Sequence, residues 1–480
     1  MTAAPPVLDD LDAAIDLAIE RVGPKLIVAA PLGLGKPVQL LNALYRRARR
    51  DNSLSLHIYT ALSLEVPKPA SDIEASLAGP IMERLFGDYE GLDYLSDLRA
   101  GRLPPNVEVS EFYVKAGSMK HVASAQQNYI SSNYTHIARD ICAAGVNVLC
   151  QLLAFRDTDD GMELSLSCNP DTAADVLDML EESRPGAYVT LGQLHPDLPF
   201  MGNDALVEPG RFTALLRNPA WDRRLFAVPN AAVPLTDYAT ALHASTLVVD
   251  GGTLQIGIGA LGDAVAQALI LRHQQNDRYR EMLEALHASP VGAEASAFST
   301  GLYVSTEMFV NGMLRLMQAG VVRRKVYDNL PIQQGLNSGA IGETIDGQFY
   351  RYARESGLLP PRLSDESLEG LKSFGVVGED VSLRGDELCI GQDSFANDTR
   401  DEETVAALLA SSAGTLQNGR ILHGGFFLGP ADFYESLRTM DAADLEQICM
   451  TSVARTNQLL LDPALYRAQR VRARFINTGM

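Results

Sequence analysis

Two stretches of the sequence carry residues whose types and spacing could do chemistry. LQIGIGALGDAVAQAL, residues 254–269, contains a complete G-x-G-x-x-G at Gly257, Gly259 and Gly262, followed by an Ala-rich helical pattern. Backbone N–H groups of such a turn can hold an anionic or polar group at the start of a helix. STGLYVSTEMFVNGMLRLMQAG, residues 299–320, places Glu307 between a strand-like and a helix-like pattern.

We expect Glu307 at the carboxyl end of that strand, in the first turn of the following helix. Open α/β sheets bind their ligands at this edge. The alternative is structural: a carboxylate in a first helical turn complements the helix dipole.

The G-x-G-x-x-G invites a second reading, as a dinucleotide-binding fingerprint. That fold needs a second strand after the helix, ending in an acidic residue about 20 positions on. Here the helix continues into RHQQNDRYREMLEALHASP, residues 272–290, which is charged and helical. An NAD-linked oxidoreductase that binds its cofactor through these glycines therefore remains an alternative hypothesis, but the sequence lacks the second strand that this hypothesis requires.

Three further segments allow both a structural and a binding interpretation. PLGLGKP, residues 31–37, lacks the first Gly and the Ser/Thr of a phosphate loop, which leaves a tight turn or a simple anion site. SSNYTHIARD, residues 131–140, is either a helix cap or a substrate contact. Two basic clusters are either solvated helix ends or sites that attract a phosphorylated ligand. The first cluster is Arg46, Arg47, Arg49 and Arg50; the second is Arg323, Arg324 and Lys325.

The elements that must position these residues follow an α/β pattern. We expect strands at 26–30, 54–62, 145–155 and 187–194, and helices at 11–22, 38–50 and 171–183. Alternating strands and helices are typical of parallel sheets covered by helices. The proline-containing stretch 227–245 separates two such units. We therefore predict two tandem α/β domains with mainly parallel sheets, at residues 1–235 and 236–480.

Composition excludes several classes of protein. The chain has 480 residues and a formal net charge of −20, which argues against a nucleic-acid partner. The sequence contains no apolar run of about 18 residues, so we expect no membrane span. The 5 cysteines are scattered and the histidines lack paired metal spacing, so we expect reduced thiols, a cytoplasmic protein and no metal.

The sequence resembles the acetyl-CoA hydrolase/transferase family of class I CoA-transferases, most closely a long subtype. DGGTLQIGIGALGDAV (250–265) and GLYVSTEMFVNGMLRLMQAGVV (301–322) carry the resemblance as an ordered pair, and PLGLGKP does so more loosely. The resemblance implies a CoA-transferase-like α/β fold. It also implies transfer of coenzyme A between a short acyl-CoA and a carboxylate, or hydrolysis of the acyl-CoA.

The resemblance also implies roles for individual residues. Glu307 matches the nucleophilic glutamate, which forms a mixed anhydride and then a glutamyl-CoA thioester. The family's CoA-contacting loop matches Gly257, Ile258, Gly259, Ala260 and Leu261. Coenzyme A would be a substrate, and no tightly bound cofactor is expected. The expected partners are the acyl-CoA and the carboxylate, and homo-oligomerisation is left open.

Two departures from the family shape the remaining expectations. The spacing between Ala260 and Glu307 is longer than the resemblance predicts, so we interpret 272–298 as an insertion that covers or reshapes the CoA site. The family also continues with a segment of the G-x-G-G-Q kind, so we expect further residues beyond Met480. LHGGFFLGPADF, residues 422–433, is interpreted as a different glycine-rich turn. A catalytically inactive CoA-binding or scaffold protein remains the third hypothesis.

Overall fold

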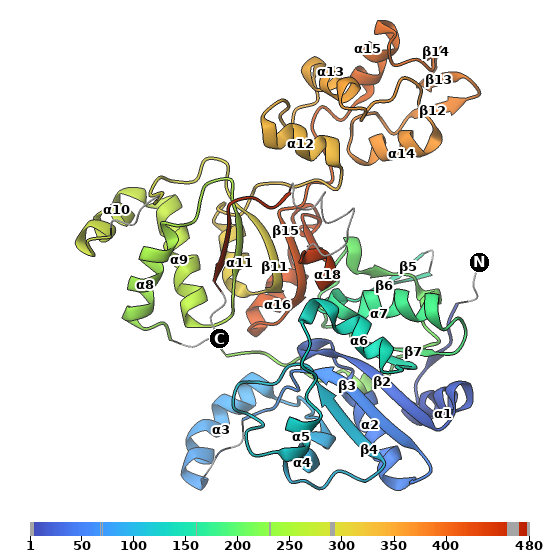
Figure 1. Cartoon of the computed structure of the whole chain (residues 1–480), viewed down its shortest axis with the longest axis vertical. Coiled ribbons are helices and arrows are strands. Elements are labelled where there is room, and N and C mark those ends of the chain that lie inside the picture. Colours follow the sequence, from blue (N-terminus) through green and yellow to red (C-terminus); the bar gives the residue numbers. More distant parts are fainter. Residues whose placement is uncertain are drawn as a thin grey trace.

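The computed structural model describes residues 4–67, 69, 71–159, 161–229, 232–288, 293–457 and 470–477. Two parallel sheets, one in each half of the chain, form its framework, and a third, separate lobe rises above them (Figure 1). The α/β class with mainly parallel sheets is therefore confirmed.

The first sheet has a parallel path of seven strands in the order β1-β9-β7-β5-β2-β3-β4. A short antiparallel branch, β6 and β8, continues from β5. The strands are β1 (Val7–Leu8), β2 (Lys25–Leu32), β3 (Ser55–Ala61), β4 (Val107–Glu111), β5 (Val148–Thr158), β6 (Gly161–Ser165), β7 (Val189–Leu194), β8 (Leu206–Val207) and β9 (Ala214–Leu216).

Helices cover both faces of this sheet, which explains why its central strands are almost wholly apolar. One core packs under α1 and α2, and a second under α6 and α7. The helices of this half are α1 (Leu11–Val22), α2 (Val38–Arg50), α3 (Asp72–Phe86), α4 (Asp93–Arg99), α5 (Ala123–Gln127), α6 (Ile137–Ala143) and α7 (Pro170–Ser183). The bounds expected for the helices at 11–22 and 38–50 are confirmed.

The second sheet is parallel throughout, in the order β16-β15-β11-β10-β17. Its strands are β10 (Thr253–Ile256), β11 (Tyr303–Phe309), β15 (Leu422–Phe427), β16 (Ile448–Met450) and β17 (Arg474–Asn477). Its helices are α8 (Leu235–Ser245), α9 (Ala260–Gln274), α10 (Asn276–Ala285), α11 (Asn311–Gln318), α16 (Ala431–Arg438), α17 (Ala442–Leu445) and α18 (Val453–Thr456). The proposed domain boundary at 235/236 falls between the two sheets.

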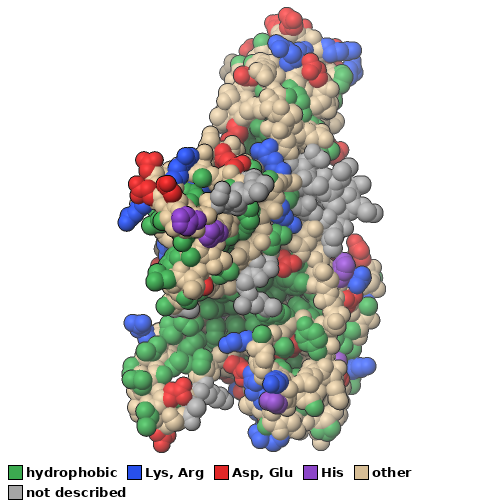
Figure 2. Space-filling model, turned by 60° about the vertical axis from the view of Figure 1, so that its left-hand side comes forward, with side chains coloured by type: hydrophobic (Ala, Val, Ile, Leu, Met, Phe, Trp, Pro, Cys, Tyr) green, Lys and Arg blue, Asp and Glu red, His purple; other side chains and the backbone are tan. Residues whose placement is uncertain are grey.

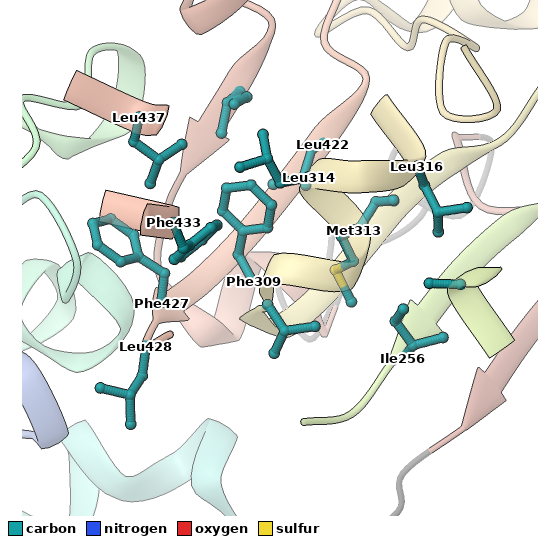
Figure 3. Close-up of a cluster of buried hydrophobic side chains, with 14 of the residues drawn as sticks. Ile256, Phe309, Met313, Leu314, Leu316, Leu422, Phe427, Leu428, Phe433 and Leu437 are labelled. Atoms are coloured by element: carbon teal, nitrogen blue, oxygen red, sulfur yellow. The ribbon is translucent and has the colours of Figure 1, made fainter. Parts of the chain in front are cut away.

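The core of the second half is rich in aromatic and aliphatic side chains (Figure 3). The Phe309 and Phe427 rings of neighbouring strands both meet the Phe433 ring of α16 edge-on, with centroids 5.1 and 5.9 Å apart. Met313 and Leu314 of α11 pack into the same cluster. This cluster fixes β11 and β15 against their helices, and so fixes the strand that carries Glu307.

The third lobe is an excursion between β11 and β15, which are far apart in sequence but adjacent in the sheet. It has its own apolar core, which runs from Tyr327 to Leu416. Its elements are α12 (Leu330–Ser338), α13 (Gly347–Glu355), α14 (Asp365–Ser373), β12 (Val381–Arg384), β13 (Glu387–Ile390), β14 (Asp393–Ala396) and α15 (Glu402–Ser411). The two-domain expectation does not describe this lobe.

Candidate active site

Glu307 lies within β11, four residues before α11 begins at Asn311. The strand continues past Glu307 because Met308 and Phe309 pair with Phe426 and Phe427 of β15. The expectation that Glu307 stands in the first helical turn is therefore wrong. So is the structural alternative, because the first turn of α11 contains no acidic residue.

The half-buried Glu307 side chain is held by an amide. Asn457, directly after α18, donates from Nδ2 to Glu307 Oε1 at 2.7 Å. The same Nδ2 lies 2.8 Å from Thr135 Oγ1, which belongs to the first half of the chain. Groups from both halves thus orient the carboxylate.

The predicted CoA loop follows the strand next to the one that carries Glu307. Thr253 pairs with Tyr303 and Leu254 with Val304, so β10 and β11 run side by side in parallel, and neighbouring strands lie about 4.8 Å apart. β10 ends at Ile256, and Gly257 N then donates to the Asn477 carbonyl of β17 at 2.7 Å. Ile258, Gly259, Ala260 and Leu261 therefore leave the sheet at the same edge as the carboxyl end of β11.

The loop leaves the start of α9 open. Gly259 is the N-cap of α9, has φ +118° and provides no side-chain cap, while Ile258 is 38% exposed. Unpaired N–H groups at a helix start attract anions. The third glycine has a packing role, because a methyl group at Gly262 would overlap the carbonyl oxygen of Gly257.

The segment 272–298 does not cover this loop in its described part, so that expectation is wrong for α10. The helix α10 follows the C-terminal end of α9, whereas the loop precedes its N-terminal end. The Tyr279 hydroxyl lies 2.9 Å from Ser245 Oγ, which ties α10 to α8. Residues 289–292 of the segment lie outside the described residues.

The strand that a dinucleotide fold requires is absent from the described residues 272–288 but follows later as β11. It pairs in parallel with β10, which makes a β-α-β unit with an unusually long connection. Glu307 stands within this second strand, four residues after its beginning at Tyr303 and two before its end at Phe309. The late strand explains how a G-x-G-x-x-G and a distant glutamate come to share one sheet edge.

The glycine turn of the first sheet is closed by protein groups. Gly35 N donates to Asn169 Oδ1 at 2.8 Å, and Gly33 has φ +60°. The buried Lys36 amine donates to the carbonyl of Ala61 and, at 3.2 Å, to that of Leu62. These donors are therefore already hydrogen-bonded to protein groups, which favours the structural interpretation of PLGLGKP.

Three buried ionisable groups gather at this edge. Burial lowers the pKa of Lys36 to about 7, while the carboxylates of Glu111 and Asp171 oppose that shift. Burial raises the pKa of Asp171 to about 6, against hydrogen bonds from Tyr134 and Asn169. Burial also raises the pKa of Glu111.

Gly425 of β15 lies close to both Glu307 of the second sheet and Asp171 of the first half of the chain. A Cβ at Gly425 would lie 2.8 Å from the Glu307 carbonyl oxygen and 3.6 Å from Asp171 Cβ. The stretch interpreted as a glycine-rich turn, 422–433, therefore begins as a strand beside β11, and that interpretation is wrong for 422–427. A glycine pair inside a strand pattern signals close backbone approach and could have identified it.

Asn457 and Thr135 are the site residues that the sequence did not indicate by themselves. In SSNYTHIARD, Asn133 Oδ1 accepts from Thr135 N at 3.0 Å, so the predicted cap is present. The side chain of Thr135 meets Asn457 nevertheless, so the segment also belongs to the site. No local pattern marks Asn457, because its role depends on contact with a strand 150 residues earlier.

The two basic clusters are tied to protein groups. Arg46 pairs with Glu90 and Asp93, and Arg47 with Asp16. In the second cluster, Arg323 donates to backbone carbonyls and Lys325 pairs with Glu343. These contacts favour the structural interpretation of both clusters.

The described residues show neither a membrane-spanning helix nor a cluster of metal ligands. No helix among them is long and apolar enough to cross a membrane. Within the same residues, no three His, Cys, Asp or Glu side chains converge as a metal site would require.

Comparison with known proteins shows the fold. No family model matches the sequence, and no curated protein is detectably similar in sequence. The crystal structure of RipA from Yersinia pestis matches with a TM-score of 0.52 and 15% identity, over 94% of this chain and 69% of RipA. A 4-hydroxybutyrate CoA-transferase from Porphyromonas gingivalis matches with a TM-score of 0.45 and 14% identity, over 94% of this chain and 68% of that one. The chain therefore shares the α/β fold of RipA.

Proposed function

We propose that the protein transfers coenzyme A between a short acyl-CoA and a carboxylate, or to water, through a glutamyl-CoA thioester on Glu307. The observation that supports this most is that an oriented carboxylate, Glu307, stands on the strand parallel and next to the one that leads into the open, glycine-rich start of α9. The resemblance of the two motifs in sequence supports the same function.

The proposed first step forms an anhydride. A Glu307 carboxylate oxygen attacks the acyl carbon, the carbonyl electrons move to oxygen, and CoA leaves as the thiolate. The thiolate then attacks the Glu307 carbonyl carbon of the anhydride and expels the acyl group as a free carboxylate. Glu307 is left as a thioester of CoA. A carboxylate is a competent nucleophile when it is aimed and partly desolvated.

The second half of the reaction regenerates the enzyme. An acceptor carboxylate attacks the glutamyl thioester, CoA thiolate leaves and attacks the acceptor's acyl carbon, and Glu307 is released as a carboxylate. Attack by water on the thioester gives hydrolysis instead. The Gly257 N–H already donates to the Asn477 carbonyl at 2.7 Å, so the N–H groups of residues 258–261 are the ones that would stabilise the oxyanion of each tetrahedral intermediate.

The test is to trap the thioester. The whole chain is incubated with acetyl-, propionyl- or butyryl-CoA without an acceptor and then treated with borohydride, which reduces a thioester to an alcohol. Peptide mass spectrometry should locate the alcohol at residue 307. In Glu307→Gln the adduct should be absent, and turnover should fall by more than about a thousandfold, as expected for loss of a nucleophile.

Glu281→Gln, an exposed change on α10, is the matched control and should form the adduct normally. If CoA raises the melting temperature but no acyl-CoA gives an adduct, the protein binds CoA without this chemistry, which is the scaffold hypothesis. Stabilisation by NAD and not by CoA would instead support the oxidoreductase hypothesis.

A further inference from the structure

A cavity of about 220 Å³ lies where three parts of the molecule meet. Its floor is the second sheet, through Tyr303 and Ser305 of β11, His423 of β15 and Cys449 of β16. The segment around Asp204 closes it from the first half. Ser373 and Phe374 close it from the third lobe. We call it the junction cavity.

The junction cavity is cationic, although the whole chain is strongly acidic. Its walls carry Arg420, Arg455 and Arg470 against the carboxylates of Asp204 and Asp328. Two of these arginines are paired: Arg455 lies 2.8 Å from Asp204, and Arg470 lies 3.8 Å from Asp328. A local excess of positive charge in a walled site concentrates anions.

Arg420 accounts for that excess. It donates to the amide oxygens of Asn203 and Asn418, at 2.6 and 3.4 Å. Among the described residues, no carboxylate oxygen lies within salt-bridge distance of its guanidinium. A guanidinium held by neutral acceptors keeps its full charge for a ligand and can bind a carboxylate or phosphate through two parallel bonds.

The charged groups converge on the cavity floor. Burial raises the pKa of the Cys449 thiol to about 12, with Asp204 adding to the shift and Arg420 and Arg470 opposing it. His423 Nδ1 lies 2.9 Å from the Tyr303 hydroxyl, so this wall offers polar groups as well.

We propose that the junction cavity is a second ligand site, which binds a small anion through carboxylate or phosphate oxygens on Arg420. Neither Glu307 nor the 257–261 loop is among the residues that line it. The helix α18 borders both sites: Thr456, whose carbonyl accepts from Ser305 Oγ at 3.2 Å, lines the cavity, and the next residue, Asn457, holds Glu307. An anion beside Arg455 would therefore restrain the helix that leads into Asn457.

The experiment is a calorimetric titration of the whole chain with inorganic phosphate and, separately, with malonate, at an ionic strength of about 0.15 M to screen diffuse attraction. One or both anions should bind saturably with a Kd below about 1 mM. Arg420→Gln should raise that Kd at least tenfold. Arg420→Lys keeps the charge but loses the geometry for two parallel hydrogen bonds, so its Kd should lie between those of the wild type and Arg420→Gln.

Arg400→Gln is the matched control, since Arg400 is an exposed arginine of the third lobe paired with Asp398. It should bind the anion as the wild type does, and melting curves without anion verify that each variant is folded. Absence of saturable binding, or unchanged binding by folded Arg420→Gln, overturns the proposal. Displacement of the anion by coenzyme A also overturns it, because the cavity would then belong to the CoA site.

A different observation concerns α3, whose outer face is apolar (Figure 2, lower left). Ile73 and Leu77 are 82% and 79% exposed, and Ile81 continues the same helical stripe one turn later. The first turn of α3 carries the acidic residues Asp72 and Glu74, and its last turn carries Arg84. In an antiparallel pair of α3 helices centred on Gly79, Glu74 of one copy would lie opposite Arg84 of the other.

We infer that α3 pairs with the α3 of a second copy of this chain. Light scattering after gel filtration should show a dimer that Leu77→Asp dissociates. Leu235→Asp, at an equally exposed leucine of α8, should leave the dimer intact. Glu74→Arg should weaken the dimer, and adding Arg84→Glu should restore it. A wild-type monomer, or a Leu77→Asp dimer, would exclude this interface.

Discussion

The two glycine turns of this chain stand at equivalent edges of their sheets and serve different ends. The turn after β2 gives its Gly35 N–H to Asn169 and its Lys36 amine to carbonyls of the chain. The turn after β10 has no side-chain cap and carries an exposed residue, Ile258. One edge is closed and holds buried charges, whereas the other is open and adjoins Glu307.

The difference is the reason why we place the proposed ligand at the turn after β10 and not at the turn after β2. A buried donor that already has a partner gains little from a ligand, because the exchange of hydrogen bonds is nearly neutral. The closed edge contributes instead through Thr135 and Asp171, which reach the neighbourhood of Glu307. The open edge supplies the loop itself.

The largest effect should come from Gly262→Ala. A methyl group there would overlap the Gly257 carbonyl, so the open loop must move. We expect loss of CoA binding and a fall of about 3 kcal/mol in the free energy of unfolding, measured by thermal shift and urea titration. Gly370→Ala, a helical glycine with open space around it, should instead add up to about 1 kcal/mol. If Gly262→Ala kept its affinity for CoA, the loop would not be part of the CoA site.

Asn457→Ala should reduce formation of the glutamyl adduct by about a hundredfold, because a misaimed carboxylate loses its approach to the substrate. The rate of adduct formation under single-turnover conditions measures this. Thr135→Val removes only the second partner of Asn457 and should cost less. Equal rates for the wild type and Asn457→Ala would show that the amide does not position Glu307.

Lys36→Met should change how stability depends on pH. The folded state releases the Lys36 proton near pH 7, whereas the unfolded chain keeps it until about pH 10.5, so the unfolded state binds more protons between these values. As the pH rises from about 7 to about 10, the free energy of unfolding of the wild type should therefore increase relative to that of Lys36→Met. Urea unfolding at several pH values tests this, with exposed Lys120→Met as the control. Parallel pH profiles of wild type and Lys36→Met would contradict the buried, shifted amine.

The smallest effects should come from two glycines with positive φ, Gly33 and Gly259. Alanine at either position costs about 1–2 kcal/mol of stability from backbone strain. Only Gly259→Ala should also weaken CoA binding, because only its turn is open. The CoA-induced shifts in melting temperature of the two variants measure this difference. Equal losses of CoA binding would contradict the claim that only the turn after β10 binds CoA.

Local patterns predicted much of the framework. The helices at 11–22 and 38–50 have the expected bounds because amphipathic spacing and flanking turn residues act over a few residues. Glu307 was mistaken for a helical residue because MFVNGMLRLMQ contains a helical spacing from its beginning. Pairing with Phe426 and Phe427, more than 100 residues later, extends the strand instead.

The sequence by itself determined the α/β class and the glycine loop, since residue type and short spacing carry that information, and the resemblance to the CoA-transferase family implied Glu307 as the candidate nucleophile. Only the tertiary structure decided which glycine turn is open, because Asn169 closes the other from 134 residues away. It also decided that Asn457 and Thr135 meet at Glu307, and that three arginines surround one cavity. Such contacts depend on the packing of sheets and lobes, which no local pattern encodes.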